Sequence, residues 1–568
     1  MLPALIFYSL LLILLVAFPA GLILAVLLFL DHERQFWQRV TSVRIPFMAM
    51  LGKRPFMVEF ARKFPRTTAF LAHRLDPRDP WGLPATVTAL GAFLGLWFFL
   101  GVLQDLVAKD PLVILDIRLH NLVPLLRTPG VTRLMFVITE LGGPSVLSLL
   151  CIGIALLALA RNQRRLAATF VLALAGTGIL SILLKALIGQ ARPIDAMVSA
   201  NAASFPSGHL LSGTVMYGLL AALLLGSRAG GRVRALGVTL LLLVIVGIGL
   251  SRLYLGVHWP SDLLGSLALA LMLLPPLLFF LHYRGPIRWL DTVPLPFSAR
   301  AVRMTGGSAL VMALGALAVL ASRPGMLPMA LLPARQPIDI SALRTALPPD
   351  IPRLSEDLIG GQMEPLSLVL VGSENDLMNG FTRAGWTRAD LPTPVCLVRE
   401  GLAALRNQPD PSGPATPVFL ADQPQNLTLE KPGTGTPSIR RRHHTRLWQT
   451  RYCLSPDCRA VWIATASYDT GLELSPRLHL PTHRIDPDID VERELIMRDL
   501  MAIGAKPEGK VTISPPLYGE NAAGDHFYTD GRAIVIVLPQ TPTMPAQQGH
   551  SVDGRLQSWW NPAMGKRT

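Results

Sequence analysis

Three short polar clusters interrupt an otherwise apolar part of the chain, at residues 185–193, 205–209 and 251–262. Each adjoins a long apolar run, where ionisable side chains are costly and therefore mark candidate functional sites. Together the clusters contain three cations, two histidines, a Ser-Gly pair and a carboxylate. These are the groups that chemistry on a phosphate requires.

The cations and the Ser-Gly pair fit an oxyanion. Lys185, Arg192 and Arg252 carry enough positive charge to neutralise a phosphate or diphosphate, and arginine can hold two phosphate oxygens at once. Ser207 and Gly208 stand where a helix is expected to begin, so free backbone N–H groups and the hydroxyl can point at the same oxygens. The sequence therefore predicts a phosphate-binding site.

The two histidines supply candidates for the reaction itself. His258 and Asp262 are four residues apart, so in a helix the carboxylate holds one imidazole nitrogen and leaves the other as a nucleophile. His209, in another cluster, can then act as a general acid. Each piece alone has an ordinary structural explanation, as a helix cap, a structural His–Asp pair or a cation reaching the headgroups. The combination favours catalysis.

The composition predicts a membrane protein. Of 568 residues, 51% are hydrophobic and only 16% are charged, too apolar a mix for an ordinary soluble enzyme. Eight apolar stretches without Asp, Glu, Lys, Arg or His are long enough to be considered as bilayer spans. They are residues 1–30, 80–104, 141–160, 166–184, 210–227, 235–251, 263–281 and 304–322. The first is interpreted as a retained span, because no basic residue precedes it as in a secretory signal.

Lysine and arginine are unevenly divided between alternate loops. One set of loops carries 20 of these residues and the other carries 7, so the positive-inside rule makes the first set cytoplasmic. Both termini and the three polar clusters are then extracytoplasmic. Residues 323–568 hold 25 basic and 26 acidic residues, so the formal charge of +14 belongs to the membrane half. This pattern excludes nucleic acid as the expected partner and favours anionic lipid headgroups.

Taken together, the clusters resemble the three-part signature of the type-2 phosphatidic acid phosphatase family, which bacterial acid phosphatases and vanadium haloperoxidases share. The pattern is K-x6-R-P, P-S-G-H and S-R-x5-H-x3-D, and every specified position is matched. The resemblance covers residues 84–282 and implies His258 as a nucleophile forming a phosphohistidine, Asp262 as its orienting partner and His209 as the acid. It also implies that no metal or cofactor is needed. The implied phosphate ligands are Lys185, Arg192, Ser207, Gly208 and Arg252.

The expected substrate is a lipid phosphate at the outer face of a bacterial inner membrane. Phosphatidic acid, a polyprenyl diphosphate such as undecaprenyl diphosphate, phosphatidylglycerol phosphate and a phosphorylated lipid A all fit the resemblance. Two other functions stay open: a lipid-phosphate binding or transport protein without turnover, and a vanadate-dependent peroxidase. Residues 111–136 fit either an interfacial helix beside the substrate entrance or a plain connector. The oligomeric state is not indicated.

The predicted fold is an all-α polytopic membrane protein followed by a soluble α+β domain. A six-helix phosphatase core is flanked by one span on each side, and a proline-rich linker leads to the extracytoplasmic domain. Within that domain, residues 366–371, 461–466 and 533–538 are expected to be buried strands, and residues 491–503 an amphipathic helix. The predicted segments are a span at 1–30, a basic cytoplasmic segment at 31–79, the core at 80–282, a loop and last span at 283–322, the linker at 323–352, the α+β domain at 353–540 and a loose tail at 541–568.

The α+β domain resembles the C-terminal domain of LssY-like bacterial membrane proteins, through residues 385–390, 442–448, 462–469 and 482–494. This resemblance implies no biochemical role. His483 with the nearby aspartates fits either a divalent cation or the acidic start of a helix. The basic residues 440–446 fit either an anion-binding site or a solvated strand face. Cys453 and Cys458 lie on either side of a predicted turn, and they are expected either to form a local disulfide or to stay as two thiols. The remaining cysteines are Cys151 and Cys396.

Overall fold

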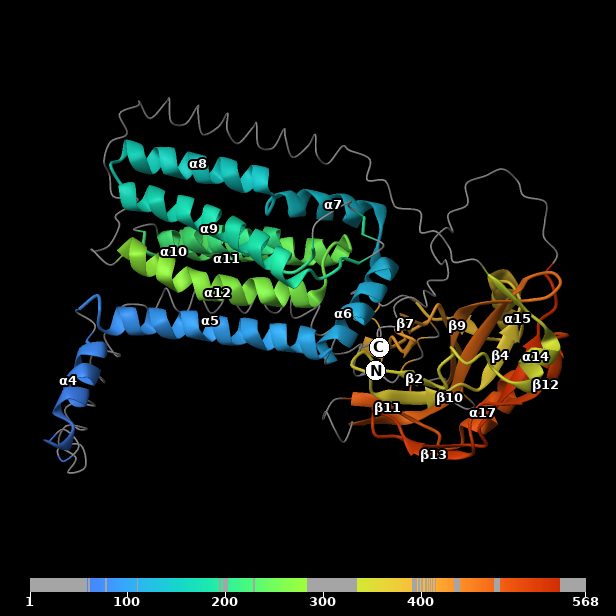
Figure 1. The fold of residues 1–568 in the computed structure, drawn as a ribbon. Helices are drawn as coiled ribbons and strands as arrows, with labels where there is room; N and C mark the ends of the chain where they lie inside the picture. Colours follow the sequence, from blue (N-terminus) through green and yellow to red (C-terminus); the bar gives the residue numbers. More distant parts are fainter. Residues whose placement is uncertain are drawn as a thin grey trace. The chain divides into compact units, whose positions relative to one another are not determined.

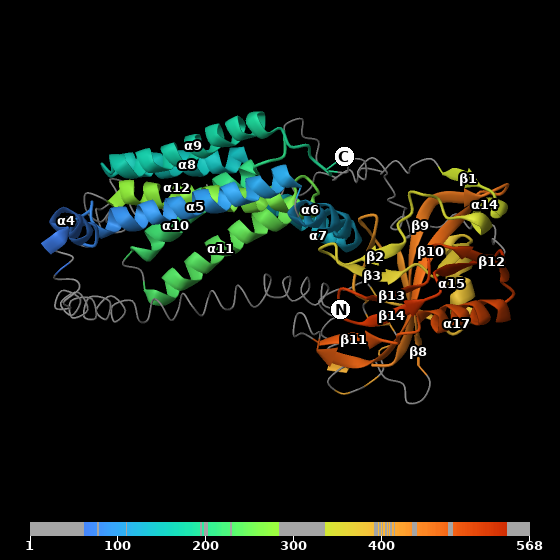
Figure 2. The same cartoon turned by 60° about the horizontal axis from the view of Figure 1, so that its bottom comes forward.

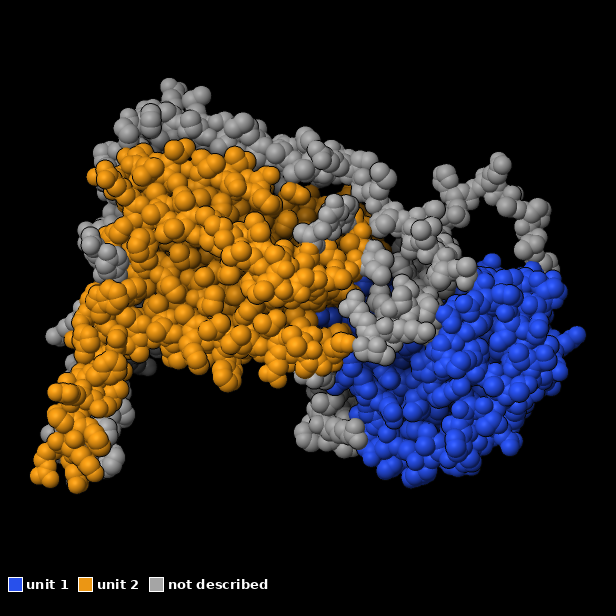
Figure 3. Space-filling model, in the orientation of Figure 1, with its two compact units in different colours: residues 1–14, 114–126, 329–568 blue, residues 15–113, 127–328 orange. Residues whose placement is uncertain are grey.

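The structure is a computed structural model that describes residues 59, 62–282 and 335–541. Gaps fall at 77–78, 110, 194–195, 198–202, 228–229, 391–395, 434–439, 475–480 and isolated positions between 397 and 414. The predicted spans at 1–30 and 304–322, and the tail beyond residue 541, lie outside the described residues. The chain divides into two compact units (Figure 3), one of residues 15–113 and 127–328 and the other of residues 1–14, 114–126 and 329–568.

The unit of residues 15–113 and 127–328, orange in Figure 3, is a bundle of helices (Figure 1). Among its described residues, five helices are long and apolar enough to cross a membrane: α5, α9, α10, α11 and α12. A sixth crossing results if α7 and α8, which are bent by 42° at their junction, form one span. The structure thus agrees with a helical membrane core with several spans. The bounds are α4 Pro65–Arg74, α5 Leu83–Ala108, α7 Pro129–Glu140, α8 Pro144–Ala160, α9 Arg164–Ile188, α10 Gly208–Leu225, α11 Gly231–Tyr254 and α12 Pro260–His282.

Helix α10 lies at the centre of the bundle, packed against α9, α11 and α12, while α5 packs along α12. The α5–α12 contact depends on Gly95, where an added Cβ would lie 2.3 Å from the backbone nitrogen of Met272. Small residues allow this close approach of helices in membranes. At Gly265 of α12, an added Cβ would lie 2.5 Å from the ring of Phe205. This glycine therefore lets the segment before α10 lie against α12.

The other unit, blue in Figure 3, contains a mixed β-sheet in which neighbouring strands follow the order β12-β15-β4-β10-β9-β8-β5 (Figures 1 and 2). In addition, β1 pairs with β9 and β11 pairs with β10, and β2, β3, β6 and β7 form a smaller sheet. The bounds are β1 Gln336–Ile338, β2 Leu354–Glu356, β3 Gln362–Pro365, β4 Leu368–Val371, β5 Thr387–Arg388, β6 Phe419–Leu420, β7 Gln423–Pro424, β8 Leu427–Pro432, β9 Arg442–Leu454, β10 Arg459–Leu474, β11 Pro481–Ile485, β12 Lys506–Thr512, β13 Leu517–Glu520, β14 His526–Thr529 and β15 Arg532–Val537.

Both faces of the main sheet are buried at its centre. In β4, Leu368 and Leu370 join a core with helices α15 (Glu374–Arg383) and α17 (Ile489–Ala502). Val369 and Val371 point into the other core, which includes α14 (Ile340–Thr345) and the smaller sheet. Burial on both faces explains why the central strands are continuous apolar runs. Strands β4, β10 and β15 and helix α17 occupy the segments that the sequence predicts for them.

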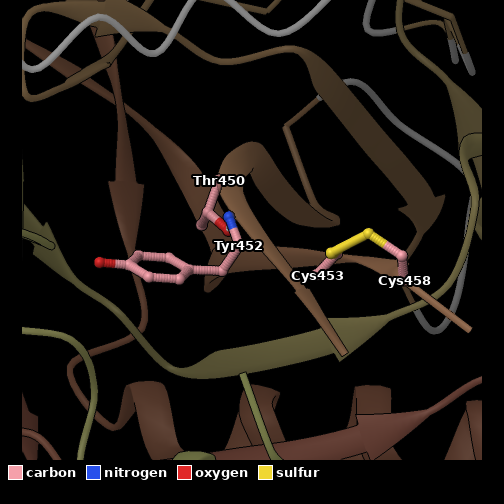
Figure 4. The surroundings of a disulfide bond; sticks show 4 residues. All are labelled: Thr450, Tyr452, Cys453 and Cys458. Carbon is pink, nitrogen blue, oxygen red and sulfur yellow. A yellow bond between two sulfur atoms is a disulfide. The ribbon is translucent and has the colours of Figure 1, made fainter. Parts of the chain in front are cut away.

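A disulfide joins Cys453 and Cys458 at the hairpin between β9 and β10 (Figure 4). The pair of strands is antiparallel, and Ala460 stands opposite Cys453 in the ladder. The sequence was compatible with either a disulfide or two free thiols at these positions, and the structure contains the disulfide. Cys151 and Cys396 are free.

Helix α6 (Pro111–Leu122) follows the first core span in sequence, but residues 114–126 belong to the unit that contains the β-sheet. The buried guanidinium of Arg118 pairs with Glu356 and, at 2.9 Å, with Asp422, and it lies over the ring of Phe419. Leu122 packs in the same cluster as Phe419. The segment interpreted as an interfacial helix or a connector is thus a helix with a docking contact on the C-terminal domain.

We expect Arg118→Glu to undock α6, because it places a third carboxylate beside Glu356 and Asp422. Removing one partner of a fully buried ion pair costs about 3–5 kcal/mol, and the cost here should be smaller because Glu356 and Asp422 are partly exposed. Limited proteolysis of the purified chain should then cut α6 faster than in the unmodified protein. The double variant with Glu356→Arg should restore protection in part, and Arg133→Glu, at an exposed position in α7, should leave it unchanged. Equal cleavage of all variants would contradict the docking contact.

Candidate active site

The polar clusters meet at one end of the helical bundle. Lys185 lies in the last turn of α9, and Arg252 lies in the last turn of α11. Gly208 begins α10, and Asp262 lies in the first turn of α12. Because consecutive helices run in opposite directions, these four helix ends come together. Chain topology therefore places residues from three distant segments at one site.

Two of the cations tie the loops of the site together. The Lys185 ammonium donates to the carbonyl oxygens of Ala203, at 2.5 Å, and Ser204, at 2.9 Å. The Arg192 guanidinium donates to the carbonyl of Val257 at 2.7 Å. Lys185 thus reaches the segment before α10, and Arg192 reaches the segment before α12. Both cations are partly buried, where their charges are screened less than at an open surface.

His258 and Asp262 form the closest pair in the site. The imidazole Nδ1 lies 3.0 Å from the carboxylate Oδ2, and both side chains are almost completely buried. The same oxygen accepts the backbone N–H of Trp259 at 2.9 Å, and Ser204 Oγ donates to the other oxygen at 3.3 Å. His258 precedes the helix instead of lying in it, because α12 begins at Pro260. The predicted contact therefore forms from a loop residue.

The contacts of His258 favour one tautomer. Its Nε2 lies 3.5 Å from Nη1 of Arg192, a group that can only donate. If Nδ1–H donates to Asp262, the Nε2 lone pair is left facing Arg192 and the rest of the site. Burial, followed by the positive charges of Arg252 and Arg192, holds the pKa of His258 well below 6.5. His258 is therefore neutral near pH 7.

The Ser-Gly pair differs in part from the expectation. Ser207 is the N-cap of α10, but its backbone N–H donates to Ser266 Oγ at 2.8 Å and is not free for a ligand. Its buried hydroxyl has no hydrogen-bond partner among the described residues. At Gly208, an added Cβ would lie 3.1 Å from Ser181 Oγ. The hydroxyl and the following N–H groups of α10, left unpaired within the helix, can still serve an oxyanion.

Arg252 and His209 complete the set. The buried guanidinium of Arg252 donates to Thr139 Oγ1 at 2.9 Å, and its Nε has no partner among the described residues. His209, in the first turn of α10, is half-buried. Arg252, Lys185 and His209 lie at the same helix ends as His258, and the positive charges of these groups lower the pKa of His258. The structure thus brings together all eight residues that the sequence singled out.

Sequence reasoning missed the residues that hold these groups in place. Thr139 positions Arg252, Ser204 contacts the carboxylate of Asp262, and Ser266 binds the backbone of Ser207. Tyr254 accepts the Thr128 backbone N–H at 3.0 Å, which ties α11 to the start of α7. The only sequence signal for Ser266 is its position one helical turn after Asp262. Nothing in the local sequence marks the other three.

Within the described residues, no group of three or more His, Cys, Asp or Glu side chains is arranged to hold a metal ion. Three cations converge on a neutral histidine whose other nitrogen is held by a carboxylate. Such an arrangement can bind a phosphoryl group and present a nitrogen nucleophile to it.

Comparison with known proteins agrees with the class of protein that this helical bundle and its site define. Residues 166–286 match the PAP2 superfamily, and residues 349–533 match the LssY C-terminus. Both resemblances predicted from the sequence motifs are confirmed. The chain thus contains one region that matches the PAP2 superfamily and one that matches the LssY C-terminus.

The relatives are bacterial phosphatases. Phosphatidylglycerophosphatase B of Bacillus subtilis is 28% identical over 185 residues, which cover 32% of this chain and 90% of that protein. Decaprenylphosphoryl-5-phosphoribose phosphatase of Mycobacterium tuberculosis is 36% identical over 95 residues, 16% of this chain and about half (47%) of that protein. A crystal structure of a transmembrane PAP2-type phosphatidylglycerolphosphate phosphatase from B. subtilis matches with 25% identity and a TM-score of 0.30, covering 34% of this chain and 93% of the other.

Proposed function

We propose that the protein is an integral membrane phosphatase that removes phosphate from a lipid phosphomonoester or diphosphate at the extracytoplasmic face, through a phosphohistidine on His258. The observation that carries the proposal is the placement of His258, with Nδ1 on Asp262 and Nε2 facing Arg192. The phosphatase relatives support the reaction class. The excess of basic residues in alternate loops supports the orientation in a bacterial inner membrane.

The proposed first step is attack of His258 Nε2 on phosphorus. A P–N bond forms, the P–O bond to the lipid breaks, and His209 gives its proton to the leaving oxygen. Lys185, Arg192 and Arg252 stabilise the charge on the equatorial oxygens, the main requirement of phosphoryl transfer. Water then attacks phosphorus, its proton passes to His209, and the P–N bond breaks. The second step releases phosphate and restores both histidines.

The substrate class is tested by phosphate release from purified protein in detergent with EDTA. The panel contains phosphatidic acid, phosphatidylglycerol phosphate, a polyprenyl monophosphate and a polyprenyl diphosphate. We expect release from at least one of them in EDTA, because the cations of the site are side chains. Binding of a lipid phosphate without release would instead favour a binding or transport protein. Release that requires an added divalent ion would contradict the metal-independent mechanism.

Arg192→Ala should lower kcat/KM about a hundredfold, the scale measured when one donor to a transition-state oxyanion is removed. Lysine at this position should restore only part of the activity, because it cannot reproduce a two-pronged contact with phosphate. Steady-state phosphate release on the best substrate gives both numbers. Arg164→Ala, at an exposed position at the opposite end of α9, is the matched control and should retain full activity. Equal activity of the two alanine variants would remove Arg192 from the site.

Removal of a nearby cation should also change the pH profile. Burial and the charges of Arg252, Arg192 and Lys185 lower the pKa of His258, so the neutral nucleophile persists well below pH 6.5. Without the Lys185 charge the pKa of His258 rises, and the acid limb of kcat/KM moves to higher pH in Lys185→Ala. Both proteins are measured with the same substrate, so the ionisation of the lipid phosphate contributes equally to the two pH profiles. An acid limb that stays in place or moves to lower pH would contradict this electrostatic coupling.

A further inference from the structure

A second group of ionisable side chains lines a cavity in the C-terminal unit. Arg442, His444 and Arg446 alternate along β9 and therefore share one face of the sheet. His483 of β11 and Asp469 of β10 line the same cavity. These residues belong to three of the four stretches through which the domain resembles LssY-like proteins. No part of the phosphatase reaction uses them.

Asp469 connects the members of this cavity. One carboxylate oxygen accepts a hydrogen bond from Arg442 Nε at 3.1 Å and lies 3.3 Å from His483 Nδ1. The other oxygen lies 3.4 Å from His444 Nδ1 and accepts no hydrogen bond from the described residues. On its far side, His444 Nε2 contacts the hydroxyl of Ser467 at 2.8 Å. Ser467 is fully buried and does not line the cavity, so this chain of contacts does not present a serine nucleophile.

His483 is left without a hydrogen bond. Its side chain is 7% exposed, and neither ring nitrogen has a hydrogen-bond partner among the described residues. A buried polar group in that state is costly unless a ligand or water satisfies it. Burial lowers the pKa of both His483 and His444 well below 6.5, so both rings are neutral near pH 7. The ring of His483 therefore offers a neutral hydrogen-bonding nitrogen to the cavity.

The charge of the cavity selects against anions. The described side chains that line it include four carboxylates and two guanidinium groups, so among these side chains the negative charges outnumber the positive charges by two. Both guanidinium groups already have carboxylate partners: Arg442 pairs with Glu430 at 2.9 Å and Arg446 with Glu364 at 3.0 Å. The fourth carboxylate is Asp525. A phosphate would meet this excess of like charge, whereas a cation would be attracted by it.

The lining also limits the kind of cation. None of the described residues that line the cavity is aromatic, so these residues form no cage of the kind that recognises quaternary ammonium groups. The described residues provide no group of three side chains arranged for a metal ion. A primary ammonium has three N–H donors and matches what the cavity offers, a carboxylate oxygen without a hydrogen bond and a neutral imidazole nitrogen.

We propose that the cavity between β9, β10 and β11 binds a primary ammonium group through Asp469 and His483. The ammonium can belong to an aminated lipid headgroup or to a small soluble amine. This site is separate from the proposed phosphatase centre and does not depend on its activity. It would give the LssY C-terminal domain a recognition role of its own.

The test is titration calorimetry of the purified full-length chain in detergent with ethanolamine, beside choline, glycerol, inorganic phosphate and zinc. We expect saturable binding of ethanolamine, weakened about tenfold or more by Asp469→Asn and by His483→Ala. His526→Ala, at an exposed position in β14, is the matched control and should bind normally. Thermal unfolding checks each variant, and His483→Ala alone decides if Asp469→Asn does not fold. All titrations are repeated with His258→Ala, which separates this site from the phosphatase reaction.

Nanodiscs distinguish the two sources of the amine. Competition of ethanolamine by phosphatidylethanolamine nanodiscs, but not by phosphatidylglycerol nanodiscs, would support a lipid headgroup as the ligand. Binding of the soluble amine without such competition would support a soluble ligand. The proposal is overturned if choline, glycerol, phosphate or zinc binds this site as well as ethanolamine does, or if no amine binds.

Discussion

Replacing His258 with alanine should abolish phosphate release from every lipid that the unmodified protein hydrolyses. The imidazole is the proposed nucleophile, and loss of a nucleophile in a catalytic unit lowers kcat by about a thousandfold or far more. No other described histidine has both a buried carboxylate partner on one nitrogen and a facing arginine on the other. Phosphate release in EDTA, measured with the best substrate of the panel, gives the result directly.

The control for this substitution is His73→Ala, in α4, because His73 is an exposed histidine of the same unit. It should keep full activity. The His258→Ala protein must also show the same thermal unfolding midpoint and the same gel-filtration profile in detergent as the unmodified protein. A folded His258→Ala variant with full activity would refute the proposed mechanism, whereas retained lipid-phosphate binding with no turnover is what the mechanism predicts.

Asp262→Asn should have the second largest effect, a loss in kcat of about 10³–10⁴, the range seen when an aspartate that orients a catalytic histidine becomes an amide. The amide is similar in size but removes the negative charge beside Nδ1 and can donate to that nitrogen. The other tautomer then becomes favourable, with the proton on Nε2 where the lone pair is needed. Because the side chain of Asp262 is fully buried, no water molecule from solvent can replace its contact with His258 Nδ1.

Separate effects on kcat and KM distinguish a loss of the orientation of His258 from misfolding of the protein. Asp262→Asn should lower kcat far more than it raises KM, since Asp262 does not face the lipid phosphate in the proposed mechanism. Ser266→Ala is the comparison variant. It removes a buried hydroxyl of α12 that binds the Ser207 backbone, and it leaves the His258–Asp262 pair intact. An Asp262→Asn protein that is folded and loses less than tenfold in kcat would contradict the orienting role.

Much of the membrane half could be predicted because its signals are local. Long uncharged runs predict helices across a bilayer, and the alternation of basic loops predicts which polar clusters share a face. The His258–Asp262 contact follows from a spacing of four residues and forms even though His258 precedes α12. Two predicted spans, at 1–30 and 304–322, lie outside the described residues and stay predictions.

The supporting contacts could not be predicted, because they join distant segments. The backbone N–H of Ser207 donates to Ser266 Oγ. The sequence had predicted Ser207 as a phosphate ligand. Thr139 holds Arg252 across 113 residues of chain. The Thr139 contact depends on how α7 packs against α11, and the Ser266 contact depends on how the start of α10 lies against α12. The only trace of either in the local sequence is the position of Ser266 one helical turn after Asp262. Local motifs therefore identified the candidate reacting groups but not the residues that fix them.

The C-terminal domain shows the same limit. Its buried strands could be recognised as apolar runs, but the basic residues of β9 fitted either an anion site or a solvated face. The structure buries Arg442 and Arg446 against carboxylates from other strands, which neither alternative included. Of the aspartates after His483, Asp488 is the N-cap of α17, since its side chain accepts from the backbone N–H of Asp490. The docking of α6 through Arg118 has no sequence signature at all.

The most direct test of the central claim is to trap the covalent intermediate. The protein is mixed with a lipid substrate labelled in the phosphoryl group, quenched rapidly in base and digested, and the labelled peptide is located by mass spectrometry. We predict one phosphorylated residue, His258, with the label stable in base, lost in acid and absent from the His258→Ala protein. Label on a serine, an aspartate or another histidine, or turnover with no labelled protein at any quench time, would contradict the phosphohistidine mechanism.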